Sequence, residues 1–90
     1  MSVLLSGLQG AQKTIQENRR LLADPRMSRS LLLGLVVLSG FPADGSEIGV
    51  IALAHHVGLG ESTTYRYVAT LLSVGLIERH PSTRRYRLPQ

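Results

Sequence analysis

Gly58 constrains the fold of this chain most, because it separates two short stretches that both have the spacing of a helix. The first stretch, residues 51–57, is mostly apolar, and a glycine after it suits the left-handed conformation that ends a helix in a sharp turn. The second stretch, residues 61–74, ends before Gly75 and is expected to turn one face inwards, formed by Thr64, Tyr67, Val68, Leu71 and Leu72. The sequence therefore predicts two helices joined by a tight turn.

The opposite face of the second helix is polar and carries hydroxyl groups and one arginine. At helical spacing it presents Ser62, Thr63, Tyr65, Arg66 and Thr70. Two helices in this order are typical of a helix-turn-helix, which lays its second helix in the major groove of DNA. Hydroxyl groups there bond phosphates or bases, and an arginine reaches a guanine or the backbone. We therefore expect these five residues to contact DNA, although Glu61 opposes phosphate binding at the start of the helix.

Two short strands are predicted after this helix, at residues 76–80 and 85–88, and the turn between them completes a hairpin. A hairpin in this position is the wing of a winged helix-turn-helix. We expect Arg84 at its tip, with Arg85 and Arg87 beside it, to contact the duplex backbone or the minor groove.

Charge and strand alternation add two expectations for the C-terminal part. The arginines at 85 and 87 share one face of their strand, so Tyr86 should point the other way, towards the core. From Arg79 onwards the chain has four arginines and no acidic residue, so we expect the positive charge to be concentrated there. The whole chain has ten Lys and Arg against six Asp and Glu, a net charge of +4, which suits a polyanionic partner.

The N-terminal segment, residues 1–24, predicts an additional amphipathic helix that ends at Asp24-Pro25. Its apolar or small residues are Leu4, Leu8, Ala11, Ile15 and Leu22, and Asn18 fills the remaining position of an a/d-like stripe. Such a stripe either forms the seam of a homodimer or folds back onto its own domain, and the sequence leaves both open.

A further helix is predicted from an N-cap at Ser28 to about Ser39. Its buried face is expected to contain Leu31, Leu32, Leu35, Val36 and Leu38. The fold class is therefore mainly α, a winged helix-turn-helix with a three-helix core, a β-hairpin wing and an additional N-terminal helix. We expect residues 1–24 to be that helix and residues 25–90 to be the DNA-binding domain.

Three parts of the sequence also resemble the DNA-binding domain of IclR-type regulators. Residues 51–59 (IALAHHVGL) followed by 61–71 (ESTTYRYVATL) are similar to its helix-turn-helix. Residues 75–88 resemble its wing, in which a Pro, a Thr and a basic-Tyr-basic-Leu ending recur, and residues 28–31 resemble the start of its first helix. The resemblance spans about residues 28–88.

The resemblance implies DNA contacts by Ser62, Thr63, Tyr65 and Arg66, and places Arg84 and Arg85 in the wing. The chain departs from the family pattern at Gly60, where Pro is common, at Glu61, where a basic residue is common, and at Arg84, where a small residue is usual. Such regulators usually continue into an effector-binding domain, whereas this sequence stops at Gln90, just after the predicted wing. We therefore expect a small stand-alone regulator in which the N-terminal helix provides dimerisation, with a fragment of a longer regulator as the alternative.

Several classes of function lack support in the sequence. There is no cysteine, which excludes disulfides, thiolate metal sites and cysteine nucleophiles. His55 and His56 are adjacent, so a helix separates them by about 100° and they cannot grip one metal together. Ser62 has no paired base at a suggestive spacing. We therefore expect no enzyme activity, no cofactor, no metal and no small-molecule ligand site.

Membrane and export signals are also missing from the sequence. The longest apolar run, residues 31–38, is far shorter than the roughly 20 residues that a membrane span needs. Residues 1–8 lack the basic start and long apolar run of a signal peptide. We expect a cytoplasmic protein associated with the nucleoid.

The expected function is sequence-specific binding of double-stranded DNA by a homodimer on an inverted-repeat site, controlling transcription. Two other classes stay open. One is a DNA-binding component of replication, partition or conjugation machinery in a mobile element, and the other is a winged-helix adaptor that binds a protein. Stacking of Tyr65 and Tyr67 on unpaired bases is a further alternative, but a helix followed by a wing suits a duplex better.

Overall fold

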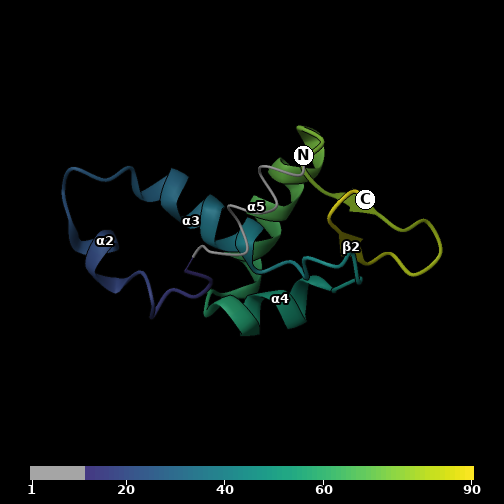
Figure 1. Cartoon of the computed structure of the whole chain (residues 1–90), viewed down its shortest axis with the longest axis horizontal. Helices are drawn as coiled ribbons and strands as arrows, with labels where there is room; N and C mark the ends of the chain where they lie inside the picture. The colour runs from purple at the N-terminus through teal and green to yellow at the C-terminus, as the bar shows by residue number, and fades with distance from the viewer. Residues whose placement is uncertain (1–11) are drawn as a thin grey trace.

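The computed structural model describes residues 12–90 (Figure 1). Its elements are the helices α2 (Arg19–Ala23), α3 (Arg29–Ser39), α4 (Val50–Val57) and α5 (Glu61–Ser73) and the strands β1 (Glu78–Arg79) and β2 (Tyr86–Arg87). The three longer helices pack together, and the two strands form a hairpin beside them. The expected mainly helical winged helix-turn-helix is confirmed.

The core lies where α3, α4 and α5 meet. Val36 and Val37 of α3, Leu53 and Val57 of α4 and Val68 of α5 are each at most 1% exposed. Burying an aliphatic side chain of this size contributes about 1.5–3 kcal/mol to folding. Because all three helices supply such residues to one cluster, α5 is fixed against α3 and α4 and keeps its other face towards solvent.

The helix boundaries follow from local signals in the sequence. Ser28 caps α3, because its Oγ accepts a hydrogen bond from the N–H of Leu31 at 3.3 Å. Gly58 ends α4 in the left-handed conformation, with φ +86°, and its N–H donates to the carbonyl oxygen of Ala54 at 2.9 Å. Both expectations are confirmed, and the turn between α4 and α5 is three residues long.

The hairpin is joined to the core through β2. Glu78 pairs with Arg87 and Arg79 with Tyr86 in an antiparallel register. Ile48 forms an isolated bridge on the other side of Tyr86, with N–H to oxygen distances of 2.8 and 2.9 Å. Tyr86 is 8% exposed and belongs to the core cluster, so its expected inward orientation is confirmed. The segment before α4 therefore holds the hairpin in place, in addition to the pairing of its own two strands.

The expected buried face of α3 is wrong at two positions. Leu31 and Leu35 are 63% and 46% exposed, whereas Leu33 and Val37 are buried in their place. The sequence offers apolar residues nearly all round this helix, so its periodicity did not define which side faces the core. Packing against α4 and α5 decides the rotation of the helix, and Leu31 and Leu35 then border a shallow apolar groove between α3 and α5.

The expected N-terminal helix is wrong over residues 12–18, because the chain is irregular at residues 12–13, bends at Thr14 and forms turns at residues 15–18, and α2 begins only at Arg19. Asn18 is 4% exposed, and its Nδ2 donates to the carbonyl oxygens of Gln12 and Thr14 at 3.0 and 2.7 Å. The N–H of Ile15 donates to the carbonyl oxygen of Val57 at 2.8 Å. The asparagine thus stabilises a turn against its own domain, an alternative to helix that this residue type favours.

The remaining stripe positions of that prediction, Leu4, Leu8 and Ala11, lie outside the described residues. None of the helices between residues 12 and 90 is long and apolar enough to cross a membrane.

Candidate nucleic-acid interface

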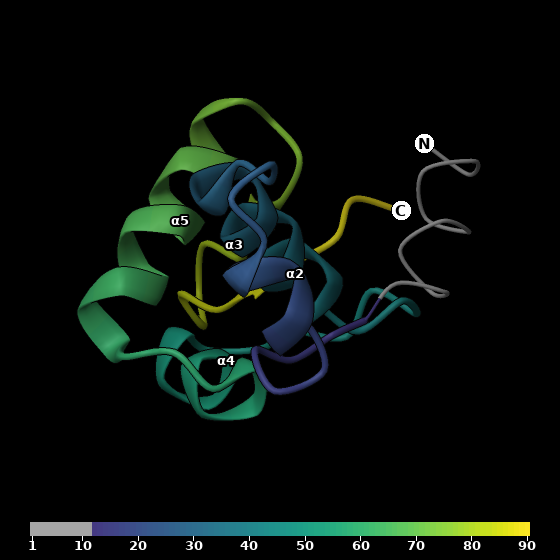
Figure 2. The ribbon, with the colours of Figure 1, turned by 90° about the vertical axis from the view of Figure 1, so that its left-hand side faces the viewer.

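The outer face of α5 carries the five residues that the sequence singles out on this helix. Thr64, Val68 and Leu71 of α5 are buried against the other helices. Their burial turns the opposite side of the helix outwards, and Figure 2 shows α5 along one edge of the molecule. The residues exposed there are Ser62, Thr63, Tyr65, Arg66 and Thr70.

The first turn of α5 leaves backbone N–H groups open. Gly60 occupies the N-cap position and has no side chain to accept from them. Thr64 points inwards, and its Oγ1 donates to the carbonyl oxygen of Gly60 at 2.9 Å. The N–H groups of the first residues of α5 can therefore donate to a phosphate.

Arg66 lies at the centre of this face, between two shallow hollows. One hollow is lined by Ser30, Thr63, Arg66, Tyr67 and Thr70, and the other by Val50, Ile51, Glu61, Ser62, Tyr65 and Arg66. Arg66 is exposed and makes no ion pair among residues 12–90. The hydroxyl of Thr70 donates to the carbonyl oxygen of Arg66 at 2.9 Å and can still accept a bond. An unpaired guanidinium on an exposed helix face is free to bond a base edge.

Arg84 at the tip of the hairpin has an unusual backbone conformation. Its φ is +62°, and it is the one non-glycine residue with positive φ within residues 12–90. Its N–H donates to the carbonyl oxygen of His80 at 2.9 Å, which closes the turn. A side chain in this region costs roughly 1–2 kcal/mol, and a glycine would avoid this strain. Strained backbone of this kind is often found at functional sites, so Arg84 stays a candidate for DNA contact.

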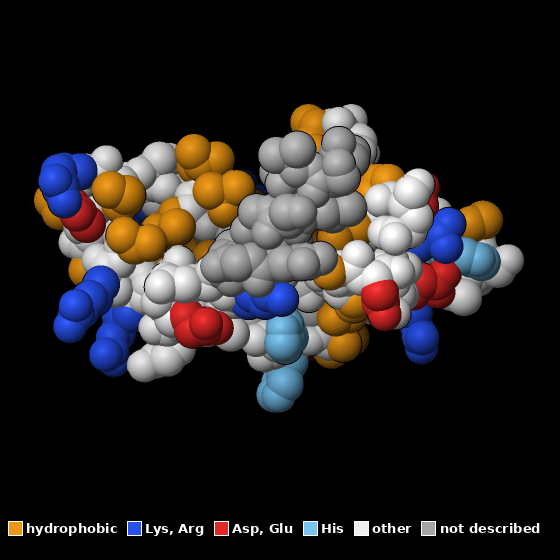
Figure 3. Space-filling model, viewed as in Figure 1, with side chains coloured by type: hydrophobic (Ala, Val, Ile, Leu, Met, Phe, Trp, Pro, Cys, Tyr) orange, Lys and Arg blue, Asp and Glu red, His pale blue; other side chains and the backbone are white. Residues whose placement is uncertain are grey.

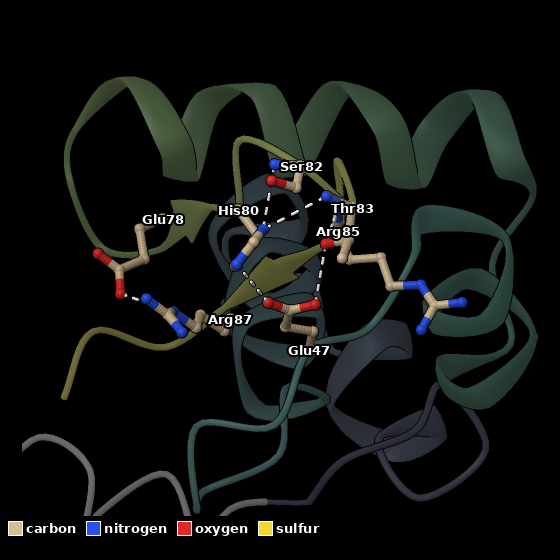
Figure 4. Close-up of polar contacts among 7 residues, drawn as sticks. All are labelled: Glu47, Glu78, His80, Ser82, Thr83, Arg85 and Arg87. Carbon is tan, nitrogen blue, oxygen red and sulfur yellow. Dashed lines mark hydrogen bonds and ion pairs between the residues drawn. The ribbon is translucent and has the colours of Figure 1, made fainter.

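A second contact fastens the hairpin turn to the segment before α4 (Figure 4). Thr83 Oγ1 donates to Glu47 Oε1 at 2.9 Å, and His80 Nε2 lies 3.7 Å from Glu47 Oε2. His80 Nδ1 accepts from the N–H groups of Ser82 and Thr83 at 3.1 and 3.3 Å. Because Nδ1 accepts, the proton of the neutral imidazole lies on Nε2 and faces the carboxylate.

Sequence reasoning missed this contact, which we call the wing latch (Glu47, His80, Thr83). Thirty-six residues separate Glu47 from Thr83, and no local pattern links them. The latch holds the turn from the side of α4, so it helps to set the direction in which Arg84 projects.

The other two hairpin arginines differ in their pairing. Arg87 Nε donates to Glu78 Oε1 at 2.8 Å, which balances its charge across the two strands. Arg85 is exposed, makes no ion pair among residues 12–90, and extends away from the Arg87–Glu78 pair in Figure 4. Arg79 lies over the ring of Tyr86, 5.8 Å from its centroid. The structure therefore leaves Arg84 and Arg85 more available to an anion than Arg87.

His55 and His56, weighed above as metal ligands, are both exposed on α4. Within residues 12–90, no three His, Cys, Asp or Glu side chains come together in a way that could hold a metal ion.

The family model of the IclR helix-turn-helix domain matches residues 30–81. This match covers α3, α4, α5 and β1, which is more than half of the chain, and confirms the resemblance in the sequence. No curated protein and no solved structure matches the chain. The family match, together with the exposed face of α5 and the hairpin beside it, shows that this chain belongs to the IclR helix-turn-helix family and contains its DNA-binding domain.

Proposed function

We propose that this chain binds a specific site in double-stranded DNA and thereby controls transcription. The observation that carries the proposal is the outer face of α5, which is polar, exposed and centred on the unpaired Arg66. In the proposed complex α5 lies in the major groove, and the hairpin contacts the adjacent backbone or minor groove.

Each residue on α5 has a role that its chemistry supports. Arg66 bonds a guanine edge, which is the commonest specific contact of an arginine in the major groove. Ser62 and Thr63 bond phosphates or bases beside the open N–H groups of the first turn, and Tyr65 offers its hydroxyl to a phosphate. Thr70 lies farther along the same face, where α5 leaves the major groove of the DNA.

The hairpin supplies contacts that do not depend on the base sequence. Arg84 and Arg85 neutralise phosphates or enter the minor groove, and Arg87 contributes a weaker field because Glu78 balances its charge. The proposal places the protein on the nucleoid in the cytoplasm, where its duplex target lies.

The proposal includes a homodimer on an inverted-repeat site, with half-sites about one helical turn apart. Because residues 12–18 are not helical, the proposed dimer does not use a continuous helical seam over that stretch. Leu31 and Leu35 support another contact, because they expose apolar area beside the groove between α3 and α5. Exposed apolar patches of this kind are typical of protein interfaces, so we assign the dimer contact to this face.

Fluorescence anisotropy with a random-sequence duplex across a salt series tests the DNA surface. We expect affinity to fall steeply with salt, because binding releases counterions from the phosphates. Arg66→Ala should lose about 1–3 kcal/mol of binding free energy on a preferred site and should relax specificity at one base position. Arg84→Ala should weaken all sequences alike and reduce the salt slope by about one.

The two variants separate base reading from phosphate binding, and the unmodified chain is the reference for both. If both variants bound like the unmodified chain, the roles assigned to these arginines would be wrong. If the unmodified chain failed to bind any duplex at low salt, a protein-binding adaptor would replace the proposed function.

A further inference from the structure

A second group of cations lies at the end of the molecule opposite the hairpin. Five of the ten Lys and Arg residues precede residue 30, against only two acids, Glu17 and Asp24. Figure 3 shows Lys and Arg side chains at both ends of the long axis. The positive charge is therefore not concentrated at the C-terminus alone, in contrast to the expectation from the sequence, because half of the Lys and Arg residues precede residue 30. The cations of this second group are Lys13, Arg19, Arg20, Arg26 and Arg29.

Not all of these cations are equally free to meet an anion. Arg26 is held by Asp24, with Nη2 2.8 Å from Oδ2 and Nε 3.2 Å from Oδ1. The same hydrogen bonds hold the pKa of Asp24 below its usual range. Arg19, Arg20 and Arg29 are exposed and make no ion pair within the described part of the chain. We refer to these three as the α2 basic surface (Arg19, Arg20, Arg29).

The position of this surface relative to α5 suggests what it binds. In Figure 1, α2 and the hairpin lie at opposite ends of the long axis, and α5 runs across that axis between them. The start of α3 borders the outer face of α5, because Ser30 lines a hollow together with Thr63 and Arg66. Arg29 is the residue next to Ser30. The N-terminal end of α3, with Arg29, therefore borders the face of α5 that is proposed to meet DNA. Arg19 and Arg20 line a separate hollow on α2, together with Glu17.

A helix in the major groove lies steeply across the duplex axis. Elements on the two sides of that helix therefore lie one after the other along the duplex. The molecule is 41 Å long, which corresponds to about 12 base pairs at roughly 3.4 Å each. A duplex that holds α5 in its groove thus passes the hairpin on one side and the α2 end on the other.

We propose that the α2 basic surface is a second phosphate-binding surface, which contacts the DNA backbone on the side of α5 opposite the hairpin. This inference rests on the proposed function and extends it. It predicts that one protomer covers a full helical turn of the DNA. Arginines at both ends of the protomer contact the backbone, and α5 reads the bases between them. The hairpin and α2 then fix the register of α5 in the groove without reading bases themselves.

The salt dependence of binding measures these contacts directly. The probe is a duplex longer than the 41 Å molecule, and the variant is Arg19→Gln combined with Arg20→Gln. Each phosphate contact contributes about 0.9 to the slope of log affinity against log salt, so the double variant should lower the slope by about two. Arg29→Gln should lower it by about one. Arg26→Gln is the matched control, because Asp24 already balances that exposed arginine, and its slope should stay at the wild-type value.

Hydroxyl-radical footprinting on a selected site locates the contact. The wild-type chain should protect the backbone on both sides of the groove that α5 occupies, and the double variant should lose protection on the side away from the hairpin. Wild-type binding with an unchanged slope and footprint in the double variant would overturn this inference and leave the proposed function intact. Failure of the wild-type chain to bind any duplex would overturn both. Circular dichroism before and after substitution checks that the fold is retained.

Discussion

Arg84 shows at the scale of one residue how function and stability compete. The sequence places an arginine where the family usually has a small residue, and the structure places that arginine at φ +62°. The strain has no packing reason, because the residue is exposed at the tip of the turn. The proposed contact of this positive charge with DNA is the physical reason that we assign to it.

Arg84→Gly should therefore raise the stability of the fold and weaken DNA binding. Relief of the left-handed strain should raise the free energy of unfolding by about 0.5–1 kcal/mol, after the entropy of the added glycine is counted. Urea denaturation measures the first effect and anisotropy the second. Arg85→Gly is the control, because Arg85 has negative φ and a glycine there should lower stability. Lower stability of Arg84→Gly would contradict the assignment of strain.

Gly58 is the second residue whose backbone conformation affects the stability of the fold. Its φ of +86° directs the chain from α4 into α5, and a Cβ there would meet only an ordinary contact with Ile15. Gly58→Ala should therefore destabilise the fold through its backbone alone, by about 1–2 kcal/mol. Gly60 is the matched control, because its φ is −66° and a Cβ would enter open space.

Urea denaturation of both glycine variants checks this prediction. Equal effects of Gly58→Ala and Gly60→Ala would mean that the left-handed turn is not what limits stability. The comparison also tests the turn that Gly58 predicts in the sequence.

The hairpin is the element whose position the sequence could not supply. Its strands and its turn were expected, and Tyr86 was expected to point inwards. The wing latch is not predictable in this way, because Glu47 precedes α4 and Thr83 lies 36 positions farther along the chain, so only the tertiary fold brings them together. A carboxylate beside a hairpin that is proposed to bind DNA would repel phosphate, so its presence needs a structural reason, and the latch provides one.

Two substitutions of Glu47 separate the effect of its hydrogen bond to Thr83 on DNA affinity from the effect of its negative charge. Glu47→Gln keeps an oxygen that accepts from Thr83 and removes the negative charge, so DNA affinity should equal or exceed that of the wild type. Glu47→Ala removes the hydrogen bond as well, so the hairpin should be less well oriented and the affinity should fall several-fold. Anisotropy with one duplex measures both. If both variants bound more tightly than the wild type, the carboxylate would act through its charge alone.

At the scale of the whole molecule, α3 carries an exposed apolar face beside the basic residue at its N-terminal end. Leu31 and Leu35 are exposed on α3, although the pattern of the sequence predicts them in the core. If two copies bury this face, Leu35→Glu should shift the chain from dimer to monomer in sedimentation equilibrium. Val74→Glu is the control, because Val74 is 65% exposed at the end of α5 and does not line the groove between α3 and α5.

DNA binding by the Leu35→Glu variant adds a second readout. A monomer should keep its salt-dependent binding to random DNA but lose affinity for an inverted repeat, because it holds only one half-site. An unchanged mass for this variant would place the dimer contact elsewhere, and a monomeric wild type would remove the homodimer from the proposal.

The sequence by itself determined the features that depend on neighbouring residues. Ser28, Gly58 and Gly75 set helix ends through local hydrogen bonds and backbone preferences, and α5 turned the expected side outwards because its apolar and polar residues are clearly segregated. The rotation of α3 was decided by packing alone, since this helix is apolar nearly all round. The non-helical backbone at residues 12–18 depends on a buried Asn18 and on the end of α4, and the wing latch joins residues far apart in the chain. Such contacts form only when distant segments meet, so they belong to the tertiary structure.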